Sequence, residues 1–453
     1  MPDLPAGRRG GSAADPADEH VMDELQQTVE PGQGAALDPQ LFRHESGRMV
    51  VALTRLFGIH NLALAEDVVQ DAFCRAIEVW KFKGVPANPS AWLMATAKHR
   101  AVDLLRRERT ARTYEPELTR MIESEWTLVP TVHEVFEPHA IQDEQLRMMF
   151  SCCHPRLRED ARVALVLHIL CGFSVGEIAG AFVSGLAATE KRITRAKKVL
   201  AQSKKLFEVT EAPEFQKRLP DVQRALYLLF NEGYHGASAE TAVRGELCRE
   251  AMRLTAMLLE HPLGKTPGTY ALAALMRLHA ARLPGRVDAA GNLHSLLDQD
   301  RSQWDWTLMK DGVALLELSA TGSAVTEYHV EAAIAAVHGR ARRVEDTDWA
   351  AIVELYDTLM KVRPSPIVAL NRAIAMAQKD GPERGLEEIG AIADRERLMG
   401  YPFYFAAMGE MELRRGMRET AGRQFGAALA LARNPMERRF LEERVKACAG
   451  GDR

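Results

Sequence analysis

The sequence predicts an all-α protein of several helical domains, and three observations support this prediction. Apolar residues recur every three or four positions through most of the chain, which is the period of an α-helix. Residues 211–453 contain little of the alternating pattern that is typical of β-strands. The 453 residues, 47% hydrophobic and 26% charged, are enough for two to four soluble domains, each with its own core.

Charge is distributed unevenly along the chain. The net charge is −4, but residues 1–38 carry −6 and residues 39–205 carry +5, while the remainder is nearly balanced. We expect residues 1–38, which are acidic and rich in Gly, Pro and Ala, to form a disordered tail. The basic surface of the first half favours an acidic partner such as nucleic acid.

The cysteines and the hydropathy indicate where the protein works. The six cysteines are scattered and no CxxC motif occurs, which fits reduced thiols in a reducing compartment. The N-terminus lacks the apolar core of a signal peptide, and no window reaches the roughly 18 apolar residues of a membrane span. We therefore expect a cytoplasmic protein that does not enter a membrane.

Residues 39–112 are predicted to form a helical domain with two contrasting surfaces. A helix over 39–60 precedes a helix over 63–80, whose apolar stripe faces inward and whose outer face is acidic. After a loop over 81–90, a helix runs to about Arg109, and residues 98–112 carry six basic side chains against two acidic ones. Such a row of basic side chains is typical of a surface that contacts the phosphates of a nucleic acid, and the rings of Phe82 and Trp92 could stack on unpaired bases. The alternatives are solvated helix faces and, for Trp92, a place in the core.

A second helical unit is predicted over residues 141–205, after a linker over 113–140. Ser174 and Glu177 form a capping-box pattern that opens a short helix, and a break at Gly185 leads to a basic helix ending near Leu200. This order of short helix, turn and basic helix predicts a helix-turn-helix that enters a DNA major groove. The alternative is a basic amphipathic helix that contacts nothing.

Helical segments recur through the second half of the chain. We expect a helical extension over 211–320 and tetratricopeptide-like repeats over 325–450. Residues 366–399 and 402–435 place small and apolar residues at the spacing of a 34-residue repeat.

No catalytic motif stands out, so we expect neither an enzyme nor a cofactor. The sequence contains no GxxxxGK, GxSxG or HExxH. Cys152-Cys153-His154 resembles a metal cluster, but a packed turn of reduced thiols explains it more simply. Residues 231–235, NEGYH, are interpreted as a helix end at Gly233, and the acidic and aromatic residues of 298–306 as an ionic and aromatic core network.

Several segments together resemble one family. AEDVVQDAFCRAIEVW (65–80), AWLMATAKHRAVDLLRRER (91–109) and LREDARVALVLHILCGFSVGEIAGAF followed by TEKRITRAKKVL resemble sigma factors of the sigma-70 superfamily, of the extracytoplasmic-function type. FSCCHPRL, LYLLFNEGYHG, LCREAMRL, DQDRSQWDW, EDTDWAAIVELYD and SPIVALNRAIA resemble the subgroup with a long tetratricopeptide-like C-terminal extension. The resemblance implies sigma region 2 over 39–112 and sigma region 4, a helix-turn-helix, over 141–205.

The resemblance also implies roles for individual residues. The partners would be core RNA polymerase, through the coiled coil of its largest subunit and its flap, and promoter DNA, both duplex and melted. Asp67, Gln70 and Asp71 would bind the coiled coil. The −10 element would be melted and read by Lys83, Asn88, Trp92, Lys98, His99, Arg100, Asp103, Arg106 and Arg107. The −35 element would be read by Lys191, Arg192, Thr194, Arg195 and Lys198.

The sequence departs from the family pattern at two places. His99 stands where many relatives have Asn, and residues 185–188, GLAA, replace the usual polar start of the recognition helix. The extension resembles a built-in regulator that docks on the sigma domains or binds a partner protein. One alternative function is a helix-turn-helix regulator with a tetratricopeptide sensor that binds duplex DNA without polymerase. Another is a helical scaffold or enzyme with incidental basic helices.

Overall fold

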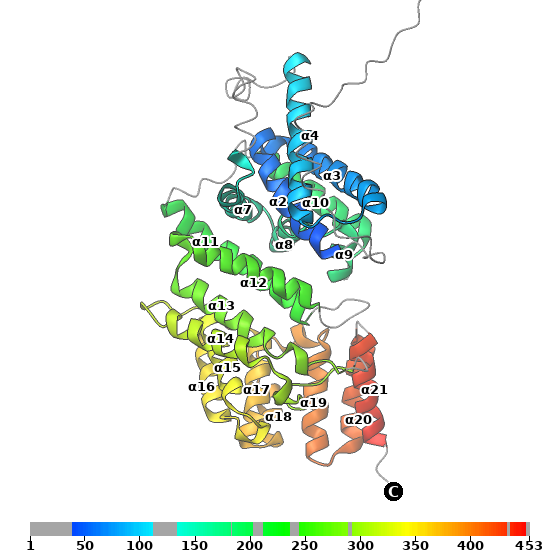
Figure 1. Ribbon diagram of the computed structural model, residues 1–453. Helices are drawn as coiled ribbons and strands as arrows, with labels where there is room; N and C mark the ends of the chain where they lie inside the picture. The colour runs from blue at the N-terminus through cyan, green and yellow to red at the C-terminus, as the bar shows by residue number, and fades with distance from the viewer. Residues whose placement is uncertain are drawn as a thin grey trace, which may run out of the picture. The chain divides into compact units, whose positions relative to one another are not determined.

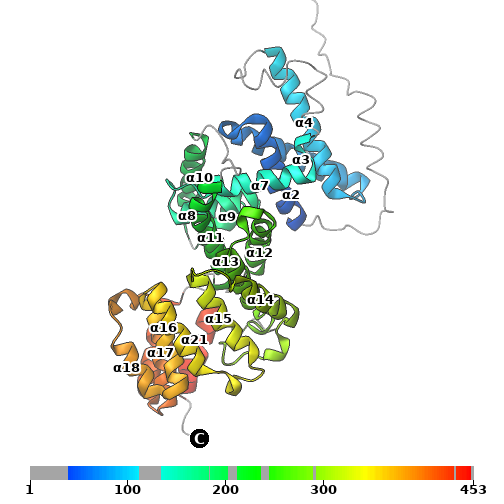
Figure 2. The ribbon, with the colours of Figure 1, turned by 90° about the vertical axis from the view of Figure 1, so that its left-hand side faces the viewer.

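A computed structural model describes residues 39–111, 134–182, 184–202, 212–235, 244–288, 292–432 and 435–449, and side chains within most of these ranges. In these ranges the regular structure is helical, and the one extended pairing is an isolated bridge between Val287 and Leu293, which confirms the all-α class. The predicted tail over 1–38 and most of the predicted linker over 113–140 lie outside the described residues. The described chain forms two compact units (Figures 1 and 2).

The first unit contains residues up to Ser151 together with 168–173 and 197–207. Gly58, at a φ of 81°, ends the first helix as predicted, and its N–H donates to the carbonyl of Thr54 at 2.9 Å. The helices of this unit are α2 (Pro39–Phe57), the 3₁₀ turn Ile59–Asn61, α3 (Leu62–Lys83), α4 (Pro89–Ala111) and α7 (Pro138–Cys152).

Aromatic rings hold α3 and α4 together. The rings of Trp80 and Trp92 meet edge to face with centroids 5.4 Å apart, and Phe42 of α2 packs against Trp80 at 5.7 Å. The loop between α3 and α4 is shorter than predicted, because α3 continues past Trp80 to Lys83 and ends at Gly84, whose φ is 80°. Asn88 then caps α4 by accepting the N–H of Ala91 at 3.1 Å.

The segment 168–173 packs very closely against α2 within the first unit. A Cβ at Gly47 would lie 2.1 Å from the carbonyl oxygen of Leu170, so only glycine permits this approach. The guanidinium carbon of Arg43 lies 4.2 Å from the centre of the Phe173 ring. These contacts join parts of the chain that are more than 120 positions apart, and neither follows from helical periodicity.

The second unit begins with three short helical segments, α8 (Glu159–Leu165), α9 (Val175–Ala181) and α10 (Leu186–Ala201). Ser174 and Glu177 form both hydrogen bonds of the predicted capping box. The start of α10 lacks the usual polar cap, but the hydroxyls of Ser184 and Thr189 are 2.6 Å apart and Thr189 is fully buried. This hydrogen bond anchors the turn before α10. The helix α10 is continuous, and its residues from Lys197 onward belong to the first unit.

The extension consists of helices that pack mainly against their neighbours in sequence. Their order and bounds are α11 (Ala212–His235), α12 (Gly245–Glu260), α13 (Pro267–Ala280), α14 (Trp306–Ser319), α15 (Glu327–Arg340), α16 (Trp349–Val362), α17 (Pro366–Asp380), α18 (Pro382–Gly390), α19 (Pro402–Arg414), α20 (Arg418–Leu431) and α21 (Pro435–Ala449), with short 3₁₀ turns at Pro262–Gly264, Leu283–Gly285, Arg301–Gln303, Val344–Asp346 and Arg395–Leu398.

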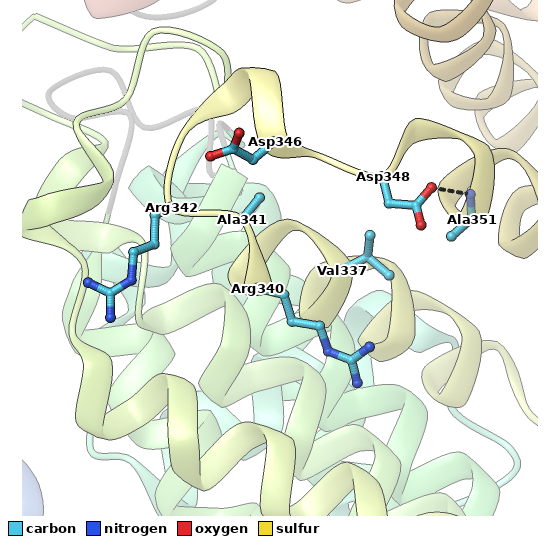
Figure 3. A pocket seen from close by; sticks show the side chains of 7 residues that line it. All are labelled: Val337, Arg340, Ala341, Arg342, Asp346, Asp348 and Ala351. Atoms are coloured by element: carbon cyan, nitrogen blue, oxygen red, sulfur yellow. Dashed lines mark hydrogen bonds between the residues drawn. The ribbon is translucent and has the colours of Figure 1, made fainter.

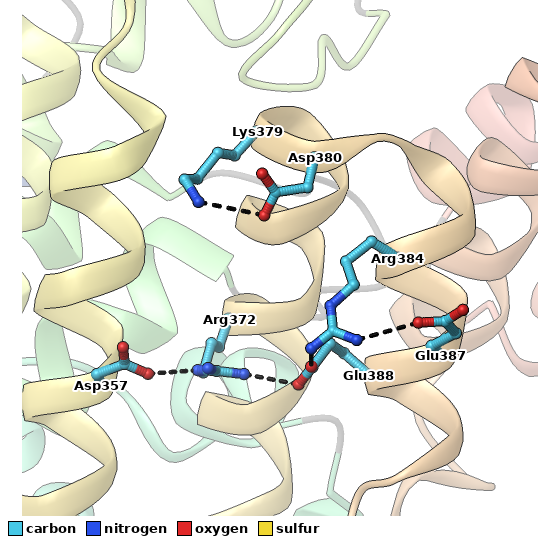
Figure 4. Close-up of polar contacts among 7 residues, drawn as sticks. All are labelled: Asp357, Arg372, Lys379, Asp380, Arg384, Glu387 and Glu388. Carbon is cyan, nitrogen blue, oxygen red and sulfur yellow. Dashed lines mark hydrogen bonds and ion pairs between the residues drawn. The ribbon is translucent and has the colours of Figure 1, made fainter.

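Small residues allow the last helix pairs to approach each other. A Cβ at Gly409 of α19 would lie 3.0 Å from the ring of Phe425 on α20, and a Cβ at Gly385 of α18 would lie 2.4 Å from Cβ of Ala377 on α17. Polar links reinforce the stack, because Arg372 of α17 donates to Asp357 of α16 at 2.6 Å and to Glu388 of α18 at 2.7 Å (Figure 4).

Two predictions about single residues differ from the structure. The NEGYH segment ends α11 as predicted, but the helix continues past Gly233 to His235, and a Cβ at Gly233 would lie 2.8 Å from the sulfur of Cys248 on α12. Ile77 was expected on the buried stripe of α3, but half of its surface is exposed. Close packing of α11 against α12 explains why glycine stands at position 233.

A buried arginine holds the end of α15. Arg301, only 3% exposed, donates to the carbonyls of His338 and Ala341 at 3.0 and 2.7 Å and to the hydroxyl of Thr347 at 3.2 Å. Its guanidinium carbon also lies 5.1 Å from the centre of the buried Trp304 ring, as the predicted core network requires. Burial and then the charge of Arg282 lower the pKa of Arg301. Ala341, whose carbonyl accepts from Arg301, also lines a pocket of about 390 Å³. The pocket is lined by Val337, Arg340, Ala341, Arg342, Asp346, Asp348 and Ala351 (Figure 3).

We expect Arg301→Met to destabilise the extension by about 2–4 kcal/mol, because it leaves buried acceptors without donors. Urea unfolding and faster hydrogen exchange in the last turn of α15 would measure the effect. The control is Arg343→Met, which removes an exposed cation paired with Asp346 and should change little. Equal stability of the two variants would show that Arg301 does not hold this helix end.

Candidate polymerase and promoter interface

The predicted polymerase-binding residues share the outer face of α3. Asp67, Gln70 and Asp71 are exposed, whereas the intervening Val68 and Val69 are buried in the first unit. Helical periodicity and the apolar core therefore place these polar groups toward a partner.

One predicted polymerase contact is paired with one predicted DNA contact. Arg100 of α4 donates from Nε and Nη2 to Oδ2 of Asp71, at 3.0 and 2.9 Å. Both side chains are more than one third exposed, so water screens the pair and its net contribution is at most about 1 kcal/mol. Such a pair positions the two side chains and separates readily when a partner offers stronger contacts.

The other predicted −10 residues occupy varied environments. Lys83, Asn88 and Asp103 are exposed, while Lys98 and His99 are partly buried. Burial lowers the pKa of Lys98, and the charge of Glu137 opposes this effect. Arg106 and Arg107 lie on α4, and their side chains are outside the described part of the structure.

Trp92 is a correction to the predicted DNA surface. Its ring is fully buried and packs on Trp80, so it offers no face to a base. The other aromatic candidate, Phe82, is 84% exposed in the turn that ends α3 and has the access that stacking on a base requires.

The predicted −35 residues lie on the polar side of α10. Ile193, Ala196 and Leu200 are buried, and Arg192 is partly exposed, with its Nε 3.4 Å from Oδ2 of Asp160 on α8. The carboxylate of Asp160 on α8 thus holds the side chain of Arg192, a predicted DNA contact, within the second unit. The remaining residues of this group, Lys191, Thr194, Arg195 and Lys198, are exposed.

A charged cluster next to the acidic face was not foreseen from the sequence. The carboxylate oxygens of Glu66 on α3 lie 2.6 and 2.7 Å from Nζ of Lys197 on α10. The Nε2 atom of His168 lies 3.0 Å from the same Nζ and 3.4 Å from the carboxylate. We call Glu66, His168 and Lys197 the α3–α10 cluster. Residues so far apart in sequence follow no local pattern, so only tertiary packing reveals them.

Within the second unit, the extension contacts α8. Nη1 of Arg162 lies 2.6 Å from Oδ1 of Asp221 on α11, and Arg162 is only 11% exposed. Nε of Arg224 on α11 lies 3.5 Å from the carboxylate of Glu159. The first helix of the extension is therefore attached to α8 by two cross-helix ion pairs, one of them half-buried.

Packing explains the two motifs that the sequence analysis singled out as possible sites, the Cys152–Cys153 pair and the NEGYH segment. Cys152 and Cys153 are fully buried, and burial raises the pKa of the Cys153 thiol to about 12. Within the described residues, no group of three metal-ligating side chains comes together. In the NEGYH segment, burial raises the pKa of Glu232 to about 7, and Arg282 donates to the hydroxyl of the buried Tyr234 at 2.8 Å.

Comparison with known proteins gives the class of protein. Residues 42–111, which contain α3, α4 and most of α2, match the family model of sigma-70 region 2. The chain thus contains a sigma-70 region 2 domain, which supports a role in transcription initiation with core RNA polymerase and promoter DNA. Residues 218–320 match a family of unknown function, DUF6596.

The particular family is shown by a full-length relative. An uncharacterized protein of Rhizobium meliloti (strain 1021) is 36% identical over 392 residues, which cover 86% of this chain and 90% of the relative. The chain belongs to the same family as that protein, since the match spans the sigma segment and the extension together. In the described part of the chain, the structure contains no helix that is both long and apolar enough to span a membrane.

We expect the α3–α10 cluster to control the titration of Glu66. Burial by itself raises the pKa of Glu66, but the hydrogen bond with His168 and the charge of Lys197 bring it below 4.5. The cluster should therefore be fully formed above the unfolded-state pKa and be lost as the pH falls through the lower folded-state pKa. An NMR titration of the Glu66 carboxyl measures this midpoint.

Lys197→Met should move the Glu66 midpoint upward, because burial remains while the cation is gone. Lys446→Met removes an exposed cation on α21 and serves as the control, with no change expected. A wild-type midpoint at or above 4.5 would mean that the cluster does not form in solution.

Proposed function

We propose that the protein is a cytoplasmic sigma factor of the extracytoplasmic-function type, which directs core RNA polymerase to its promoters and carries its own regulator as a C-terminal extension. The observation that carries this proposal is the pairing of surfaces in the first unit. An acidic face on α3 adjoins a basic helix α4, and Asp71 and Arg100 are in contact at the junction. One surface fits the basic coiled coil of the polymerase largest subunit, and the other fits the melted −10 strand.

The chemistry of this function is binding without bond formation. Opening the −10 duplex costs a few kcal/mol for each unstacked base, and contacts to phosphates and to a flipped base offset this cost. Lys98, Arg100 and Asp103 on α4 would follow the displaced strand, and the exposed loop around Asn88 would hold the flipped base. The exposed Phe82 is available for stacking beside that loop.

The helices α8, α9 and α10 are proposed to act as sigma region 4. Their order matches a helix-turn-helix, with the capped α9 leading through a tight turn into α10. The exposed Lys191, Thr194 and Arg195 would enter the −35 major groove, with Lys198 contacting phosphates or bases nearby. Arg192 would first have to leave Asp160.

The extension is proposed to be a tetratricopeptide-like regulator that docks on region 4. Its last helices form pairs whose close contacts fall at Gly385 and Gly409, the small positions expected for such repeats. Its first helix is attached to α8 through Asp221 and Arg224. Binding of a partner protein to the extension would reach region 4 through this attachment.

A duplex-DNA regulator that works without polymerase is the second reading. Such a regulator would also contain a helix-turn-helix and helical repeats. It would not need an acidic helix next to a helix that binds single-stranded DNA. The acidic face of α3 favours the sigma factor, and polymerase dependence separates the two functions.

The proposal predicts that Asp71→Arg abolishes polymerase binding. An arginine would face the basic coiled coil with like charge, so affinity should fall by at least about thirtyfold. Pull-down with core polymerase and run-off transcription from a cognate promoter would measure this. Glu443→Arg is the control, because it makes the same charge change at an exposed position on α21, outside the first unit. Promoter-specific DNA binding without any polymerase requirement would favour the second reading.

A second experiment tests regulation by the extension. Asp221→Lys leaves the nearly buried Arg162 facing a like charge, so α11 should separate from α8 at a cost of about 2–4 kcal/mol in stability. We expect run-off transcription to differ from that of the wild type by at least about twofold. Asp380→Lys, at an exposed pair with Lys379, is the control. Transcription unchanged from the wild type, with the extension detached, would contradict a regulatory role.

A further inference from the structure

A carboxyl group without a counter-cation lies where the first helix of the extension meets α15. Glu331 of α15 is partly buried, and its Oε2 accepts the hydroxyl of Tyr227 on α11 at 3.0 Å. Within the described residues, Glu331 forms no ion pair. A carboxyl in such a place is costly to ionise, because its charge is partly removed from water and only a phenol stabilises it.

Two arginines act on Glu331 through space, but other carboxylates pair with them. Nη1 of Arg363, just after α16, lies 2.6 Å from Glu327. Nε of Arg224 on α11 lies 3.5 Å from Glu159 of α8. Glu327 stands one helical turn before Glu331 on α15, so it adds a like charge to the same face.

The other close neighbours of this carboxyl are aromatic. The ring centroids of Tyr227 and Tyr328 are 5.4 Å apart. Burial and then the charge of Glu331 raise the pKa of Tyr356 on α16 to about 12, so this third phenol lies within electrostatic reach of the carboxyl. A neutral phenol donates a hydrogen bond but brings no positive charge.

The remaining helices that pack on α15 direct their charges elsewhere. On α13, Arg277 is acted on by Asp311 of α14, and the ring of His279 meets that of Tyr234 at 4.9 Å. The charged residues of α14 are exposed, namely Lys310, Asp311 and Glu317. Neither helix therefore supplies the cation that Glu331 lacks.

The surroundings of Glu331 determine how this contact responds to pH. Burial raises the pKa of Glu331 to about 7, the hydrogen bond from Tyr227 opposes the rise, and the charge of Glu327 adds to it. Its contribution to stability is fully present below the unfolded-state pKa of 4.5 and is lost as the pH rises through about 7. Above that pH the folded chain must hold a buried negative charge, which opening the contact to water would relieve.

We propose that Tyr227 and Glu331 form a proton-sensitive joint between α11 and α15, closed when Glu331 carries a proton and loosened when it loses one. The contacts continue from this joint to α8 within the second unit. The guanidinium carbon of Arg224 lies 5.3 Å from the centre of the Tyr227 ring, and the same guanidinium pairs with Glu159. The joint rests on the proposed regulatory role of the extension only for its effect on transcription, and it adds a signal, the proton.

The titration of Glu331 in the full-length chain tests the joint directly. The carbon-13 signal of its carboxyl, assigned by its loss in Glu331→Gln, should have a midpoint near 7. Tyr227→Phe should move this midpoint to higher pH, because the hydrogen bond that favours the charged form is gone. Tyr401→Phe, at a partly buried tyrosine before α19, should leave it in place. A wild-type midpoint below about 5, or one that Tyr227→Phe does not move, would overturn the joint.

Amide hydrogen exchange of α11, corrected for its intrinsic pH dependence, measures the loosening. In the wild type, α11 should exchange at least about threefold faster at about pH 8 than at about pH 6. Glu331→Gln imitates the protonated carboxyl, so its α11 should exchange slowly at both. Glu354→Gln, at an exposed position on α16, should behave as the wild type. Should Tyr227→Phe fail to fold, this comparison decides alone, and equal pH dependence in Glu331→Gln and the wild type contradicts the proposal.

Run-off transcription with core polymerase separates the joint from the proposed function. The ratio of wild-type to Glu331→Gln transcription should change by at least about twofold between about pH 6 and about pH 8. If exchange depends on Glu331 while this ratio stays constant, the joint stands and regulation by the extension fails. If exchange does not depend on Glu331, the joint fails whatever the transcription assay gives.

Discussion

The packing of Trp80 against Trp92 is the contact on which the rest of the first unit depends. These two large rings, with Phe42 beside them, fix how α4 leaves α3. Because the apolar faces of both helices are buried in this contact, their polar faces are turned to the same outer side. Asp71 and Arg100 meet there, and the acidic and basic surfaces become neighbours. A sigma factor needs this arrangement, since polymerase and the melted strand must be bound side by side.

Several residues at or beside the proposed polymerase- and DNA-binding surfaces already form ion pairs within the chain. Arg100 contacts Asp71, Arg192 contacts Asp160, and the Glu66 carboxylate next to the acidic face contacts Lys197. Each pair is partly exposed, so each contributes little and can be exchanged at a small cost for contacts to polymerase or DNA. The free chain therefore keeps its charged groups ordered without holding them irreversibly.

The extension is proposed to act on the helix that is proposed to read DNA. The buried Arg301 at the end of α15 and the partly buried Arg372 between α16 and α18 link neighbouring helices of its stack. A stiff stack transmits a displacement at one end to the other, and its first helix is attached to α8 by the Arg162–Asp221 pair.

The sequence by itself determined the all-α class, the order of the helices, the capping box at Ser174 and the outward position of Asp67 and Asp71. These features follow from local periodicity and local hydrogen bonds, which neighbouring residues fix. Tertiary structure alone decided that Trp92 is core, that Gly233 and Gly47 are sites of close approach, and that Glu66 meets Lys197. Those outcomes depend on which surfaces are brought together over long stretches of chain, and no periodic pattern in one segment specifies its distant partner.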